Sequence, residues 1–112
     1  MQLEVRKYVF DINRASQAIV SFTAGKTLDD YLADPLLRSG VERQFEIAGE
    51  AINKLAKISL ETAQKITDYR KLIAFRNVLI YGYAEVDDRL VWDLVHSKLP
   101  HLLAELAALE ST

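Results

Sequence analysis

The chain is 112 residues long, half of them hydrophobic, and carries a net charge of −2. This length is typical of one domain, and we expect a single domain over residues 1–112. The absence of cysteine excludes disulfides, a thiol nucleophile and a cysteine zinc site, and we expect a protein of the reducing cytoplasm. No apolar run approaches the roughly 20 residues of a membrane span, so we expect no contact with a membrane.

Apolar spacing and the scarcity of glycine and proline predict helices throughout the chain. Apolar side chains recur at three- and four-residue steps over residues 3–24, which predicts a first helix that ends at Gly25. Thr27 and Asp30 have the spacing of a capping box, which predicts a short helix ending near Ala33.

An acidic residue followed by proline marks the start of the next helix. Asp34 is suited to cap this helix with Pro35 in its first turn, and the apolar spacing continues to about Ile58. Its inward-facing residues are expected to be Val41, Phe45, Ala48, Ile52 and Leu55. Ser59 is expected to cap a short helical turn through Ile66.

Two more helices are predicted in the second half of the chain. Asp68 is predicted to cap a helix over residues 69–81, and Asp87 to cap a last helix that reaches about Leu109. Pro100 falls inside the last helix and should kink it. The expected fold is therefore all-α, a four- to five-helix up-and-down bundle with short connections.

Charge is distributed unevenly along the chain. Over residues 65–83 the balance is +3, and from residue 84 to the C-terminus it is −4. A phosphate ligand would be attracted by the first segment and repelled by the second. Alternatively, these charges are scattered over solvated surfaces and form no binding site.

Four polar residues of the long middle helix share one face, because they are spaced three, four and three apart: Arg43, Glu46, Glu50 and Asn53. They form either a solvated face with ion pairs within the helix or one wall of a polar groove. A carboxylate beside an arginine can fix its side chain before a phosphate arrives. We therefore expect Arg43, Glu46 and Glu50 to line or brace a cleft that also holds Arg76, an arginine of the next long predicted helix.

The second polar constellation is the run of residues 75–83. Arg76 can hold a phosphate with two parallel hydrogen bonds, and Asn77 can orient a neighbour or a base. Arg76 and Tyr83 are seven residues apart and would share a helix face, provided that the helix persists beyond Gly82. These residues alone indicate a candidate phosphate site, with core tyrosines and a surface arginine as the alternative.

The run resembles the signature of the HEPN superfamily, an arginine followed after four to six residues by a histidine. It is more closely similar to the HepT-like toxins, whose version reads Arg-Asn-x-x-x-His-x-Tyr followed by Val-Asp. Residues 76–83 read Arg-Asn-Val-Leu-Ile-Tyr-Gly-Tyr, and residues 86–87 are Val-Asp. Residues 46–51 match the family's Glu-Ile-x-Gly-Glu-Ala segment, and residues 90–92 and 99–100 match its last helix. The resemblance covers nearly the whole chain.

The resemblance implies a HEPN-like fold and a metal-independent endoribonuclease without a cofactor, the toxin of a bacterial type II toxin–antitoxin pair. Two subunits would form a homodimer whose motifs face each other across a cleft, where a ribose 2′-hydroxyl attacks the adjacent phosphate of RNA. Arg76 would stabilise the charge on the phosphorus oxygens, with Asn77 in support. Tyr83 corresponds to the tyrosine to which a nucleotidyltransferase antitoxin of the MntA type attaches AMP, which would block RNA by bulk and negative charge.

The sequence departs from the family at the catalytic histidine, whose position is occupied by Tyr81. Tyrosine has a reference pKa of about 10 and is a poor base at neutral pH, whereas histidine titrates near 6.5. His96 and His101 lie on the last predicted helix, outside the motif. We therefore expect impaired activity, in either a natural variant or a toxin whose histidine was replaced so that a host could tolerate it.

Two alternative functions belong to other classes. The chain is either a catalytically silent helical module that binds the nucleotidyltransferase and serves as its substrate, or an unrelated helical adaptor dimer. A neighbouring gene for a small nucleotidyltransferase would argue against the adaptor. It would not separate the toxin from the silent module.

Overall fold

A computed structural model describes residues 1–112 and is all-α, which confirms the predicted fold class. One 3-10 turn, η1 (Tyr83–Glu85), accompanies the α-helices. The helices are α1 (Leu3–Thr23), α2 (Leu28–Ala33), α3 (Pro35–Ile58), α4 (Leu60–Ala63), α5 (Tyr69–Tyr81), α6 (Asp88–Ser97) and α7 (Leu99–Glu110). None of them is long and apolar enough to cross a membrane.

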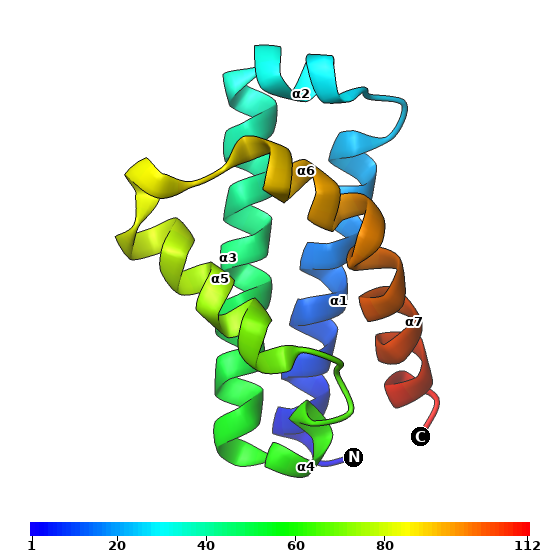
Figure 1. Cartoon of the computed structure of the whole chain (residues 1–112). Coiled ribbons are helices and arrows are strands. Elements are labelled where there is room, and N and C mark those ends of the chain that lie inside the picture. The colour runs from blue at the N-terminus through cyan, green and yellow to red at the C-terminus, as the bar shows by residue number, and fades with distance from the viewer.

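The long helices α1 and α3 run antiparallel and form the centre of the molecule (Figure 1). The short helix α2 lies between them at one end, and α4 follows α3 at the other end. α5 packs obliquely on α3, whereas α7 packs along α1, and α6 passes beneath α2. The five predicted inward-facing residues of α3 are all buried, as expected: Val41, Phe45, Ala48, Ile52 and Leu55.

The local signals at the two ends of α2 are confirmed. The backbone N–H of Asp30 donates to Thr27 Oγ1 over 3.1 Å, and the Thr27 N–H donates to the Asp30 carboxylate over 2.9 Å. The backbone hydrogen bond from Thr27 holds the pKa of Asp30 below its usual value. Asp34 then caps α3 by accepting from the N–H groups of Leu36 and Leu37.

Asp68 precedes α5 but its side chain does not cap the helix, so this prediction was wrong. Its backbone is left-handed, with φ of 60°, and its carboxylate accepts instead from Lys98 Nζ over 3.0 Å. This hydrogen bond lowers the pKa of Asp68. Lys98 also donates to the carbonyl oxygen of Thr67 over 2.9 Å, and it therefore ties the start of α5 to the junction of α6 and α7.

The last predicted helix is divided in two, where the sequence predicted only a kink. Pro100 has no N–H to donate and lies in the first turn of α7, where none is needed. The break falls at Lys98, whose N–H still donates to the carbonyl oxygen of Leu94. The turn that Ser59 caps is shorter than predicted, because α4 ends at Ala63.

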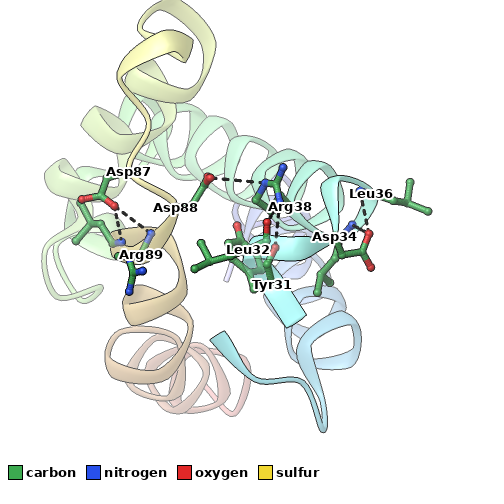
Figure 2. Close-up of polar contacts among 10 residues, drawn as sticks. Tyr31, Leu32, Asp34, Leu36, Arg38, Asp87, Asp88 and Arg89 are labelled. Atoms are coloured by element: carbon green, nitrogen blue, oxygen red, sulfur yellow. Dashed lines mark hydrogen bonds and ion pairs between the residues drawn. The ribbon is translucent and has the colours of Figure 1, made fainter. Parts of the chain in front are cut away.

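A cluster around Arg38 fixes the start of α6 against the corner between α2 and α3 (Figure 2). Arg38 Nη1 donates to the carbonyl oxygens of Tyr31 and Leu32, and its Nε lies 3.6 Å from the Asp88 carboxylate. Burial, with Asp88 close by, raises the pKa of Glu42. These contacts anchor the start of α6, where the segment between α5 and α6 ends.

Candidate active site

A hollow of about 280 Å³ opens between α1, α3 and α5, and Arg76 lies in its wall. Three of the four polar residues predicted on the face of α3 also line this hollow, namely Arg43, Glu46 and Glu50. Asn53, the fourth, does not. The structure therefore brings the polar face of α3 and the arginine of the motif into one place, as a groove wall requires.

Arg76 is held by two protein acceptors. Its Nη1 donates to Asn77 Oδ1 over 2.7 Å, and its Nη2 donates to and forms an ion pair with the Glu50 carboxylate. The Nε atom is buried without a partner, and the side chain is 19% exposed. A guanidinium has five N–H donors, so one remains on each terminal nitrogen. Two such donors on neighbouring nitrogens fit two oxygens of one phosphate.

Glu50 connects two cations from different helices. One carboxylate oxygen pairs with Arg76, and the other lies 3.9 Å from Lys54 Nζ, one turn further along α3. The guanidinium is consequently fixed in position before any ligand arrives.

Gly49 makes the Glu50–Arg76 contact attainable. A Cβ atom at this position would collide with the Cβ of Arg76 and would lie 3.1 Å from the carbonyl oxygen of Leu72. Only glycine therefore lets α3 and α5 approach this closely, and Glu50 follows directly in sequence. This geometry is a physical reason for the glycine in the Glu-Ile-Ala-Gly-Glu-Ala segment of residues 46–51.

The two motif tyrosines lie outside the hollow. α5 ends at Tyr81, and Tyr83 begins the 3-10 turn η1, so Arg76 and Tyr83 do not share one continuous helix face. Tyr81 follows Arg76 by five residues, which turns it about 140° around the helix. Tyr81 is 80% exposed and Tyr83 is 70% exposed, at the corner where α5 projects from the bundle (Figure 1). Within one subunit, Arg76 and Tyr81 therefore do not face the same hollow.

The cations around Arg76 are not those that the charge pattern indicated. Arg70 and Lys71 belong to the positive segment but line a separate hollow near the start of α5. Lys7 of α1 and Lys54 of α3 line the Arg76 hollow instead. The positive segment of residues 65–83 therefore does not gather at one site.

The contribution of α1 was missing from the sequence analysis, although a signal was present. Lys7, Tyr8 and Asp11 line the hollow from this helix. They sit at three- and four-residue spacing beside the buried stripe, so helical periodicity places them on one face.

Neither histidine of the last two helices approaches the motif arginine. The His96 ring contacts the Trp92 ring at a tilt of 55°, with ring centroids 4.6 Å apart, and its Nδ1 lies 3.0 Å from the Trp92 carbonyl oxygen. His101 is exposed on α7. Neither residue lines the hollow that holds Arg76.

The all-α bundle and an arginine braced by a carboxylate from the facing helix define a HEPN-like helical domain. A family model described as "Ribonuclease HepT-like" matches residues 12–109, and the chain belongs to this family.

Relatives named as ribonucleases cover most of the chain. It is 30% identical over 102 residues to a protein of Thermococcus cleftensis named "Probable ribonuclease HepT", covering 91% of this chain and 92% of the relative. It is 27% identical over 103 residues to a "Putative RNase" of Methanocaldococcus jannaschii, covering 92% and 84% of the two proteins. A "Putative RNase" of Caldanaerobacter subterraneus is 28% identical over 97 residues, with 87% and 86% covered. No solved structure matches the chain.

Proposed function

We propose that this chain is the ribonuclease toxin of a bacterial toxin–antitoxin pair, with an activity impaired at Tyr81. The observation that carries the ribonuclease part of this proposal is the environment of Arg76, a mostly buried guanidinium fixed by Glu50 and Asn77 with one N–H left on each terminal nitrogen. Such a group stabilises the charge that develops on the phosphorus oxygens when a ribose 2′-hydroxyl attacks the adjacent phosphate. The family resemblance implies that the reaction needs no metal ion, and Arg76 would supply the positive charge at the phosphate.

We expect the impairment because the residue that would transfer a proton is replaced by Tyr81. The 2′-hydroxyl must lose a proton as it attacks, and the family's histidine would move it. The phenol of a tyrosine titrates far above neutral pH, so it does this work poorly. The test is RNA cleavage by the Tyr81→His variant, measured with a metal chelator present.

Exposed apolar side chains next to the motif favour a homodimer with the two motifs facing each other. The end of α5 and the start of α6 carry three of them, namely Val78, Ile80 and Leu90. Pairing two copies here would bury this surface and bring a second arginine and a second Tyr81 to the cleft. A two-fold symmetric arrangement doubles the positive charge available to RNA.

We expect Val78→Asp to convert this dimer into a monomer, since a carboxylate in an apolar interface is costly to bury. Val20→Asp is the matched control, because Val20 on α1 has the same exposed fraction of 42% and lies outside the patch. Analytical ultracentrifugation at micromolar concentration measures the outcome. A monomeric parent protein would contradict the shared cleft.

We also propose that Tyr83 accepts AMP from a nucleotidyltransferase antitoxin encoded beside the toxin gene. Its side chain is 70% exposed, so an enzyme can reach the hydroxyl. Mass spectrometry of the chain after incubation with that enzyme and ATP is expected to locate AMP on Tyr83, and Tyr83→Phe should abolish the adduct there. An adduct on Tyr81 alone would contradict the proposal that Tyr83 is the acceptor.

The second candidate function is a silent partner of the nucleotidyltransferase. It is favoured by Tyr81 itself, which replaces the proton-transfer residue and is 80% exposed as a second acceptor hydroxyl. Both functions use Tyr83, and only the gain of cleavage by Tyr81→His separates them.

A further inference from the structure

A second hollow adjoins the one that holds Arg76. It has a volume of about 400 Å³ and lies between α1 and α3, where Arg14, Ala18 and Gln44 form part of its lining. The two hollows share Asp11 and Ile47, so they are neighbours along the same pair of helices.

Together the two hollows form a groove, called here the α1–α3 groove. It runs along α1 from Lys7 to Ala18, a rise of about 16 Å. This length accommodates several nucleotides of a strand whose stacked bases rise about 3.4 Å each.

The groove is positive although the chain as a whole is negative. Five cations line it, from Lys7, Arg14, Arg43, Lys54 and Arg76. The three carboxylates of Asp11, Glu46 and Glu50 leave a local balance of +2, compared with −2 for the whole chain. The groove is therefore the place on α1 and α3 where a phosphate backbone would be attracted.

The cations at the rim are held loosely. The distances are 4.0 Å between Lys7 Nζ and the Asp11 carboxylate and 3.8 Å between Arg43 Nη1 and the Glu46 carboxylate, and the two cationic side chains are 68% and 66% exposed. Exposed ion pairs of this length contribute little to stability. These cations can therefore exchange their carboxylates for phosphates, whereas the mostly buried Arg76 stays fixed by Glu50.

Tyr8 supplies an aromatic ring at the Arg76 end of the groove. It is half-buried against the core, lines the hollow with Arg76, and lies 5.3 Å by ring centroid from Lys7 Nζ. An aromatic ring beside cations that follow a backbone is the arrangement on which proteins stack unpaired bases. Bases inside a duplex are not available for such stacking.

We propose that the α1–α3 groove binds a single-stranded segment of RNA next to the cleaved phosphate, with Tyr8 stacking on a base and Lys7 and Arg14 contacting phosphates. The inference deepens the proposed function and rests on it. It commits the protein to unpaired RNA and gives α1 a role in binding substrate.

The test is fluorescence anisotropy with a short labelled oligouridine whose 2′-O-methyl riboses prevent cleavage. Tyr8→Leu is expected to weaken binding by roughly 5- to 150-fold, the range measured for loss of a stacked base. Tyr8→Phe keeps the ring and should bind several-fold more tightly than Tyr8→Leu. A duplex of the same length should bind the parent protein more weakly than the single strand.

Salt dependence tests the phosphate contacts. The logarithm of the binding constant should fall with the logarithm of salt concentration, and Lys7→Ala and Arg14→Ala should each reduce that slope by about 0.7. Lys71→Ala is the matched control, because it removes the same charge from the separate hollow near the start of α5 and should leave the slope unchanged.

The outcomes separate this proposal from the proposed function. If Arg76→Ala abolishes cleavage in a Tyr81→His background while the groove variants bind RNA like the parent, the groove proposal fails and the ribonuclease stands. If Lys71→Ala and Arg14→Ala reduce the slope of the salt dependence equally, RNA is attracted by diffuse charge, and the groove proposal also fails. If the parent binds no RNA and Tyr81→His cleaves none, both proposals fail.

Discussion

Replacing Tyr81 with histidine is expected to raise RNA cleavage by about 10²- to 10⁴-fold, the range that a positioned general acid or base contributes. The effect depends on the proposed dimer, which would bring Arg76 and position 81 of the two subunits to one cleft, because within one subunit they do not face the same hollow. Arg76 is braced by Glu50 and Asn77 and needs no rearrangement to meet a phosphate. Position 81 is exposed at the end of α5, so the imidazole of the variant fits without repacking.

Two further variants establish the origin of the gain. Arg76→Ala in the Tyr81→His background should abolish it, since arginine and histidine act on one transition state. Tyr81→Phe removes the phenol without adding a proton carrier, and it should cleave no faster than the parent. Cleavage is measured as loss of full-length RNA in the presence of a chelator. If Tyr81→His is as slow as the parent, the silent partner of a nucleotidyltransferase becomes the better account.

The fold was predictable because its signals are local. Thr27 with Asp30, and Asp34 with Pro35, each act within one helical turn, and the structure places helix starts where these residues indicate. Asp68 was the exception. Its carboxylate accepts a hydrogen bond from Lys98, 30 residues later in the chain, instead of capping α5. No local sequence pattern reveals a partner at that distance.

The sequence predicted the residues that α3 and α5 contribute to the candidate site, but not those of α1. Periodicity placed Glu46 and Glu50 on one face of a helix, and the motif singled out Arg76, but which helix faces the arginine depends on packing. α1 completes the hollow because α1 and α3 lie antiparallel at the centre, which sets Tyr8 close to the motif. The position of Tyr83 depended on where α5 ends, and the helix ends at Tyr81 with Gly82 as its C-cap.

Replacing Gly49 with alanine is expected to separate α3 from α5 and to damage both stability and cleavage. Alanine inside a helix normally stabilises by about 1 kcal/mol relative to glycine. Here the added methyl group would meet the Cβ of Arg76 and the carbonyl oxygen of Leu72, and neither atom can move without moving α5. Overpacking of this kind costs about 1–3 kcal/mol, so we expect a lower midpoint of thermal unfolding.

The effect on chemistry should be larger than the effect on stability. A shift of about 1 Å at a positioned group can cost roughly 10²-fold in rate, and Gly49→Ala moves Arg76 relative to Glu50. Cleavage by the Tyr81→His variant should therefore fall by about that factor when Gly49→Ala is added, at a temperature where the protein remains folded. Gly40→Ala is the matched control, because it lies in the same helix and its methyl group would meet only the partly exposed ring of Phe22, at 3.4 Å. That variant should be as stable as the parent or more so, with unchanged cleavage. If the two alanine variants behave alike, the close crossing of α3 and α5 is not what positions the arginine.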